Sequence, residues 1–273
     1  MNRQHLKKRP FPFDMNHLIL LKAPKNDVFA KKRVHFKKHI FLLTARIYAI
    51  IKLIFYRLID KEGKTAVATP SELFFERTKK RSIYNIQPIS NIPSIIRQGV
   101  LSYKCVTAMK HTSIAIEDVQ SRRDNVIIPN GGPLHSYANA YFDPRNPMMY
   151  KRQSMAQSLC VLAISSVVLD FKGTVISDGN AASEYSRFYS PEEGIKKLNF
   201  AQIYSKWWTD DDPYEQLKRK RIKCAEILVP DKIDFEYIIG AIVVNEKAQH
   251  DLESLGFQKT IMVHPKVFFW REG

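Results

Sequence analysis

One carboxylate lies inside an otherwise apolar stretch, Cys224-Ala-Glu-Ile-Leu-Val-Pro230. Its branched residues predict a β-strand, so Glu226 would be carried by the core of the domain. Burying an ionised carboxylate without partners is costly, so a glutamate in this position usually has a salt bridge or a chemical role. We therefore take Glu226 as the first candidate for catalysis. A lone glutamate at a sheet edge is the alternative.

Two adjacent arginines form a second cluster, in Asp118-Val-Gln-Ser-Arg-Arg-Asp124. A guanidinium group binds phosphate in a bidentate manner, so Arg122 and Arg123 are candidates for contact with a phosphorylated ligand. A charged, solvated surface would give the same pattern.

A third cluster is rich in tyrosine and proline and runs from His135 to Tyr150. Arg145 lies between two prolines, which pre-set the backbone and lower the cost of ordering a loop. Tyr141 and Tyr150 are candidates for stacking on the ring of a ligand such as nicotinamide or adenine. The alternative is an aromatic core strand followed by a rigid turn.

Short apolar runs rich in branched residues would position these clusters. We expect strands at 83–86, 159–164, 224–229, 238–244 and 260–263. A short helix is expected over Ser90–Gly99, capped by Ser90 or Asn91 and ended by Gly99. Strands mixed with few helices indicate an α+β domain with the sheet as its core.

The N-terminal quarter differs from the remainder in charge. Residues 1–69 hold 16 of the 43 lysines and arginines but only 4 of the 27 acidic residues, so most of the net charge of +16 belongs there. We expect an apolar helix near 39–59, with a linker at 60–72 and the main domain at 73–273. Three cations argue against a lone membrane span and leave packing on the domain, an interfacial membrane helix, or a nucleic-acid-binding or partner-binding arm.

Six segments between about Ile83 and Phe269 resemble the DarT family of DNA ADP-ribosyltransferases, and they occur in the family's order. They are Tyr84-Asn-Ile-Gln87 with Ile89–Leu101, Ser113–Arg123, Gly131–His135, Tyr141–Tyr150, Ser177–Ala182 and Cys224–Pro230. Each segment alone is weakly specific, but chance matches would not keep the order. Residues 1–70 are not part of the resemblance.

The resemblance implies an ADP-ribosyltransferase-like central β-sheet with short helices, and NAD as the co-substrate. It implies that Glu226 is the central catalytic carboxylate and that Arg122 polarises the acceptor base. A carboxylate near the ribose 2′-hydroxyl suits an oxocarbenium-like transition state. The expected acceptor is a base of single-stranded DNA, because its pairing edge is blocked in a duplex.

Further residues are expected to bind the co-substrate or the nucleic acid. The family's nicotinamide motif has His where this chain has Asn85, and often Thr where it has Gln87. The resemblance implies NAD contacts by Tyr141, Arg145 and Met148. Candidates for nucleic-acid contact, by stacking or by charge, are Arg123, His135, Trp207 and Trp208.

The resemblance also implies a toxin with a DarG-like ADP-ribosyl-hydrolase antitoxin, encoded by a bacterium or a phage. The three cysteines of this chain lack a short paired spacing, so neither a disulfide framework nor a metal site is expected. The N-terminus lacks signal-peptide features, so a cytoplasmic location is expected, with peripheral membrane association as an option. Two other functions stay open: transfer to RNA or protein, and a non-enzymatic binding protein with a decayed transferase fold.

Overall fold

The computed structural model describes residues 67–106, 111–113 and 117–270. The basic N-terminal region and the helix predicted at 39–59 lie outside the described residues. Within the described part of the chain, no helix has the length and apolar character needed to cross a membrane.

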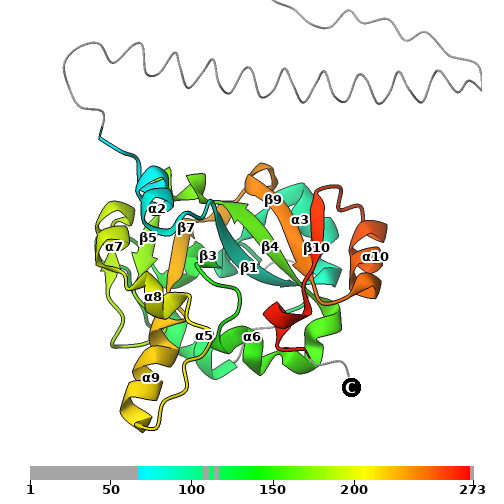
Figure 1. Ribbon diagram of the computed structural model, residues 1–273. Coiled ribbons are helices and arrows are strands. Elements are labelled where there is room, and N and C mark those ends of the chain that lie inside the picture. The colour runs from blue at the N-terminus through cyan, green and yellow to red at the C-terminus, as the bar shows by residue number, and fades with distance from the viewer. Residues whose placement is uncertain (1–66, 107–110, 114–116, 271–273) are drawn as a thin grey trace, which may run out of the picture. The chain divides into compact units, whose positions relative to one another are not determined.

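A mostly antiparallel sheet of eight strands organises the domain (Figure 1). Only its edge pair, β9 and β10, is parallel. The predicted α+β fold is confirmed. In sheet order the strands are β10 (Thr260–Val263), β9 (Ile238–Val243), β4 (Leu159–Ser165), β1 (Ser82–Pro88), β3 (Tyr137–Tyr141), β7 (Glu226–Pro230), β5 (Val175–Ser177) and β6 (Phe188–Tyr189). A separate pair joins β2 (Val100–Leu101) to β8 (Lys232–Ile233).

The central strands differ in how far they are paired. β1 pairs with β4 along its whole length, from Ser82 to Pro88. On its other side β1 shares a single register pair with β3, between Tyr84 and Tyr141. Tyr141 is in turn opposite Glu226 on β7. Residues directly opposite each other on neighbouring strands have adjacent side chains, so Tyr84, Tyr141 and Glu226 form a row across three strands.

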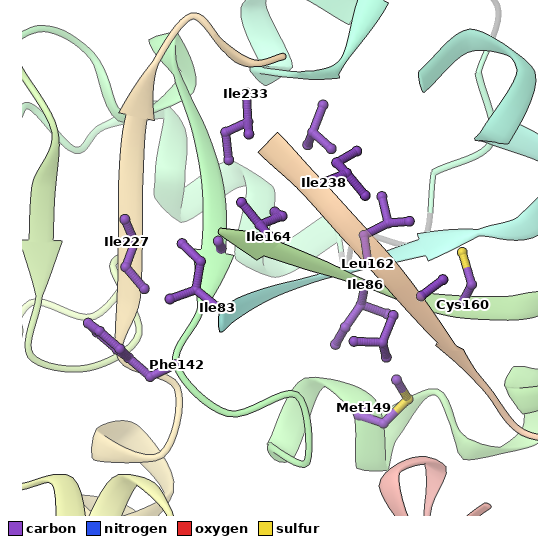
Figure 2. Close-up of a cluster of buried hydrophobic side chains, with 14 of the residues drawn as sticks. Ile83, Ile86, Phe142, Met149, Cys160, Leu162, Ile164, Ile227, Ile233 and Ile238 are labelled. Carbon is purple, nitrogen blue, oxygen red and sulfur yellow. The ribbon is translucent and has the colours of Figure 1, made fainter. Parts of the chain in front are cut away.

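The core that supports this row is apolar and dry. Ile83, Leu162, Ile164 and Ile227 are fully buried and come from β1, β4 and β7 (Figure 2). Because consecutive strand residues alternate between the two faces of a sheet, burial of Ile83 and Ile227 fixes the neighbouring Tyr84 and Glu226 on the other face.

Short helices cover the sheet and its ends (Figure 1). They are α2 (Pro70–Thr78), α3 (Ile92–Gln98), α4 (Tyr103–Val106), α5 (Glu117–Asp124), α6 (Pro147–Lys151), α7 (Pro191–Lys197), α8 (Phe200–Ile203), α9 (Pro213–Ile222) and α10 (Glu246–Ser254). The structure also has short 3₁₀ helices: η1 (Ile89–Asn91), η2 (Leu134–Ser136), η3 (Gln153–Ser158), η4 (Ser166–Asp170), η5 (Phe235–Tyr237) and η6 (Pro265–Phe268).

Most predicted elements are found, with three differences. The strand predicted at 224–229 begins at Glu226, and the linker predicted to run to residue 72 ends earlier, because α2 begins at Pro70 behind a capping box formed by Thr69 and Glu72. The helix predicted over 90–99 is α3, and Gly99 ends it at φ 81° as expected. The predicted capping bond is wrong: the Asn91 side chain bonds to the backbone of Thr112 instead.

Candidate active site

Glu226 is the first residue of β7, and only 1% of its surface is exposed. Three hydrogen bonds satisfy its carboxylate. Nη1 of Arg123 donates to Oε2 at 3.1 Å and to Oε1 at 3.3 Å, and the backbone N–H of Ala181 donates to Oε1 at 2.8 Å. A buried charge needs such partners. Together they hold the carboxylate in a fixed orientation inside the domain.

The arginine pair on α5 is divided between two environments. Arg123, rather than Arg122, contacts Glu226, and it is itself buried. Arg122 is exposed and lines the same cavity as the carboxylate. The contact to nucleic acid predicted for Arg123 and the polarising role predicted for Arg122 stay predictions. The geometry adds a function to Arg123, that of positioning the carboxylate.

Two cavities meet at Tyr141, the middle residue of the row. The first cavity encloses about 220 Å³, and the second encloses about 310 Å³. Arg123, Tyr141 and Met148 line both and so form the partition between them. Together the cavities fall in the size range of sites that hold cofactor-sized ligands.

The first cavity has a wall of side-chain amides. Asn85 donates to the backbone oxygen of Asn139 at 2.8 Å, Gln87 donates to Asn85 at 2.7 Å, and Asn91 donates to Gln87 at 3.3 Å. The β1–β3 ladder ends at the Tyr84–Tyr141 pair, so the Asn85 amide joins the two strands beyond it. Asn85 and Gln87 line this cavity, as co-substrate binding requires, and their contact with nicotinamide stays a prediction.

The second cavity holds Glu226 within a mostly basic lining. Its charged residues, besides the carboxylate, are Arg122, Arg123, Lys151, Lys220 and Arg221. Arg221 is paired with Asp178 at 2.7 Å. A cavity with this excess of cations complements phosphate groups.

Two further groups beside Glu226 keep their protons. Burial raises the pKa of Tyr141, and the negative charge of Glu226 raises it further, so Tyr141 is a neutral phenol. Burial likewise raises the pKa of the Cys224 thiol to about 12, with a smaller contribution from Glu226. Cys224 is therefore no thiolate nucleophile near neutral pH.

Met148 reaches the partition because α6 begins one residue earlier, at Pro147. The side chain of Asn146 caps this helix by accepting a hydrogen bond from the N–H of Met149 at 3.0 Å. The proline-bracketed segment is thus a strand followed by a rigid turn and a helix, which was the alternative interpretation of its composition. Tyr141 and Met148 come to one place, as the resemblance implies.

Arg145 points elsewhere. Its guanidinium donates to the backbone oxygens of Lys206 and Lys266, and it stacks on two rings, 4.5 Å from the centre of Trp207 and 3.9 Å from that of Phe269. It lines neither of the two cavities. In this arrangement Arg145 fastens the chain's C-terminal turn, and the predicted contact with the NAD diphosphate has no geometric support.

The other predicted nucleic-acid contacts are also dispersed. Trp207 is half exposed beside Arg145, whereas Trp208 is buried against Tyr150 and Phe269. Trp208 is therefore a core anchor. His135 lines the first cavity and not the second, with Nδ1 3.0 Å from Asp124 Oδ1.

Sequence reasoning missed one hydrogen-bond donor of the site and one ion pair that lies outside the two cavities. The Ala181 N–H belongs to the loop after β5, and its only signal was the Ser177–Ala182 segment of the resemblance. The second is a buried ion pair between Lys223 and Asp143, at 2.7 Å. Among the described residues, no cluster of three or more histidines, cysteines, aspartates or glutamates could hold a metal ion, and the three cysteines are free thiols.

Solved structures of a DarTG and a DarT protein share this fold. Thermosipho africanus DarTG in complex with ADP-ribose superposes with a TM-score of 0.61 at 27% identity, covering 70% of this chain and 51% of that one. Thermus sp. 2.9 DarT in complex with ADP-ribosylated ssDNA gives a TM-score of 0.62 at 24% identity, covering 70% and 97%.

The sequence comparison extends this result. Residues 84–269 match the DarT family model, described as ssDNA thymidine ADP-ribosyltransferase. The chain therefore belongs to the DarT family, and the predicted resemblance is confirmed.

Two relatives can be aligned with more than half of this chain. A Thermosipho africanus DNA ADP-ribosyl transferase–DNA ADP-ribosyl glycohydrolase fusion protein is 28% identical over 196 residues, covering 70% of this chain. The match spans about half of that fusion protein, 49% of its length. A Thermus sp. DNA ADP-ribosyl transferase is 32% identical over 158 residues, covering 54% of this chain and 73% of its own length.

Proposed function

We propose that this chain transfers ADP-ribose from NAD to a thymine base of single-stranded DNA. One observation carries the proposal: a buried, ionised Glu226 is fixed by Arg123 and the Ala181 N–H at the wall of a cation-rich cavity. The family description supports thymidine as the acceptor. Thermus sp. 2.9 DarT has been solved in complex with NAD⁺ and with ADP-ribosylated ssDNA, which supports the two substrates.

The reaction exchanges one bond at the ribose C1′ atom. The bond from C1′ to the nicotinamide nitrogen breaks, and nicotinamide leaves with the bonding electrons. A bond from C1′ to the pairing-edge nitrogen of thymine forms, and that nitrogen releases its proton to solvent water. The Glu226 carboxylate, beside the ribose 2′-hydroxyl, offsets the positive charge that develops on the sugar.

The remaining residues around the carboxylate bind and orient. Arg123 holds the carboxylate in one orientation, and Tyr141 and Met148 separate the two cavities that the extended co-substrate spans. Arg122, at the same cavity, polarises the acceptor base. A permanently protonated arginine is a poor proton acceptor, so its contribution is electrostatic. The cations at the mouth of the second cavity attract the DNA backbone.

The fusion relative supports a biological setting. It joins a DNA ADP-ribosyl transferase to a DNA ADP-ribosyl glycohydrolase. We infer that this chain is a cytoplasmic toxin whose modification is removed by a DarG-like glycohydrolase antitoxin.

The test is transfer of label from NAD to defined oligonucleotides. Single-stranded DNA containing thymine should be labelled, and oligonucleotides lacking thymine, the same sequence as a duplex, RNA and protein extract should not. Glu226→Gln should abolish labelling, whereas Glu193→Gln, an exposed carboxylate on α7, should leave it unchanged. Label on RNA or protein alone would replace the proposed acceptor, and absence of both label and NAD cleavage would refute the transferase.

A further inference from the structure

The turn between α2 and β1 carries three consecutive cations, Lys79, Lys80 and Arg81, which we call the cation cluster. All three side chains are exposed. Within the described part of the chain none of them pairs with a carboxylate, whereas other exposed lysines such as Lys196 and Lys247 do. Positive charge that the protein itself does not neutralise attracts polyanions.

Aromatic rings and a backbone hydrogen bond hold the cluster in place. Nζ of Lys79 lies 5.7 Å and Cζ of Arg81 lies 3.8 Å from the centre of the Phe75 ring. Nζ of Lys80 lies 4.8 Å from the centre of the Tyr204 ring. The backbone oxygen of Arg81 accepts from the N–H of Ser166 at 2.9 Å. Cations that are already ordered lose less side-chain entropy when they meet a ligand.

The cluster lies outside the segment that matches the DarT family model, because that match begins at Tyr84. It is nevertheless close to the active site. Arg81 precedes Tyr84 by three residues, and an extended chain rises about 3.3 Å per residue, so the two are roughly 10 Å apart. A strand bound at Glu226 therefore needs only a few more nucleotides to reach the cluster.

Exposed rings and cations lead from the cluster toward the second cavity. Tyr204, which lies beside Lys80, is followed two positions later by Lys206, and Nζ of Lys206 lies 5.8 Å from the centre of the Trp207 ring. Trp207 is 47% exposed.

The series continues from Trp207 to the cavity wall. The ring of Phe269 is 6.3 Å from that of Trp207 and 5.2 Å from that of Tyr150, measured between ring centres. Tyr150 is 46% exposed, and the next residue, Lys151, lines the second cavity together with Glu226. We call the residues from Tyr204 through Trp207 and Phe269 to Lys151 the aromatic path.

This combination suits a single nucleic-acid strand, whose unpaired bases stack on aromatic rings while its phosphates meet cations. Negative charge beside the path is partly offset, because Asp210 pairs with Arg219 and Asp212 caps the positive end of α9. An anionic lipid surface would also attract the cations. The connection to the cavity of Glu226 favours the DNA strand that reacts there.

We propose that the cation cluster and the aromatic path bind the part of the single-stranded DNA that flanks the acceptor thymine. Phosphates lie at Lys79, Lys80 and Arg81, and bases stack on Trp207 and Tyr150. This inference rests on the proposed function and deepens it, because it gives the same substrate a second contact surface. A long strand then binds more tightly than a short one that fills only the cavity.

The experiment measures binding of fluorescein-labelled single-stranded DNA to the full-length chain by anisotropy, without NAD. Lys79→Gln/Lys80→Gln removes two phosphate contacts, so for an oligonucleotide of about 20 nucleotides the slope of log affinity against log salt should become shallower by about 1.4. If affinity near 1 M salt is unchanged, this slope corresponds to about tenfold weaker binding at about 0.15 M salt. Transfer of ADP-ribose to an oligonucleotide of about 4 nucleotides, which does not reach the cluster, should change less than about twofold.

Two control variants separate local contact from net charge. Lys232→Gln/Lys247→Gln removes the same charge from two exposed lysines that pair with aspartates, and it should keep the salt slope of the unaltered chain. Lys79→Arg/Lys80→Arg keeps the charge of the cluster and should also keep that slope.

The outcomes distinguish this inference from the proposed function. An unchanged slope in Lys79→Gln/Lys80→Gln, or an equal change in the control, would refute the cluster as a DNA contact and leave the transferase standing. Loss of binding to vesicles of equal parts phosphatidylserine and phosphatidylcholine, with oligonucleotide binding kept, would assign the cluster to a membrane and overturn the inference. If the slope changes as expected but no oligonucleotide is labelled from NAD, the nucleic-acid surface stands and the proposed function fails.

Discussion

Two ion pairs lie at or just before the start of β7, and they differ in what surrounds them. Arg123 pairs with Glu226 at the start of β7, and Lys223, three residues earlier, pairs with Asp143 just after β3. Arg123 and Glu226 line the second cavity, whereas neither Lys223 nor Asp143 lines either of the two cavities. A buried charge therefore does not by itself mark an active site.

The partners of the second pair indicate a structural role. Lys223 is fully buried and also donates to the backbone oxygen of Ile203 on α8 at 3.0 Å. Asp143 also accepts from the backbone N–H of Arg145 at 3.0 Å. The pair thus ties the turn after β3 to the ends of α8 and α9. Its effect on catalysis acts through the position of the chain that carries Tyr141 and Met148.

The largest expected effect is the loss of transfer in Glu226→Gln. The amide keeps the shape of the side chain and can still accept from the Ala181 N–H, but it removes the negative charge from beside the ribose. We expect kcat to fall by roughly a hundredfold to a thousandfold, as when a preorganised electrostatic group is removed. Single-turnover transfer to a thymine-containing oligonucleotide measures it, and retention of more than a tenth of the activity would remove Glu226 from the mechanism.

The second pair should instead affect stability. Lys223→Met leaves Asp143 without its cation, and we expect the free energy of unfolding to fall by roughly 3 kcal/mol, the lower end for breaking a buried pair, because Asp143 keeps some solvent exposure. Urea unfolding measures this change. Lys218→Met, which breaks an exposed pair with Glu215, should cost less than about 1 kcal/mol. An activity loss in folded Lys223→Met as large as that of Glu226→Gln would contradict the distinction between the pairs.

The sequence alone could predict most of the elements and the carboxylate. Runs of branched residues identify the strands because their burial depends on local composition, and Gly99 ends α3 because few other residues adopt its backbone angles. Glu226 stands out because a charge within an apolar strand is unusual. The start of α2 could not be predicted because its first residues, Pro70 to Glu72, have the composition of a linker. They are helical because Thr69 and Glu72 form a capping box there.

The partners of these residues could not be predicted, since they depend on tertiary structure. Glu226 and Arg123 are 103 positions apart, and Arg145 and Lys266 are 121 apart. Neighbouring helix residues point about 100° from each other, so which arginine of the pair faces the core depends on how α5 packs. The stacking of Arg145 on Trp207 and Phe269 could not be predicted either, because nothing in the local sequence shows that these rings lie beside it.

The arginine pair gives the next prediction. Arg123→Lys replaces the planar guanidinium, whose Nη1 contacts both carboxylate oxygens, with an ammonium on a flexible stem that holds the carboxylate less firmly, so we expect kcat to fall about a hundredfold with KM for NAD changed less than about threefold. Arg122→Lys keeps a cation at the exposed position and should cost about tenfold or less. Steady-state kinetics of both variants distinguish them. The reverse order would return the principal role to Arg122, as the resemblance first implied.

The smallest expected effect concerns a third pair, His135 with Asp124, which differs from the other two because it contains a histidine whose pKa is lowered by burial. Burial lowers the pKa of His135, and Arg123 lowers it further, against the opposing charge of Asp124. Tyr103 is the other group that faces the ring. Below the ordinary histidine pKa of about 6.5, the unfolded chain therefore binds a proton more readily than the folded one, so this residue's contribution to stability is complete above that pH and falls as the solution becomes more acidic.

Urea unfolding midpoints at about pH 7.5 and about pH 5.5 measure this contribution. The midpoint of the unaltered chain should decrease more on acidification than that of His135→Asn, which cannot take up the proton. His250→Asn, at an exposed position on α10, should follow the unaltered chain. If His135→Asn lost as much or more on acidification, Asp124 would outweigh burial, and His135 would be a cation that donates from Nε2. That outcome would leave the Arg123–Glu226 pair unchanged.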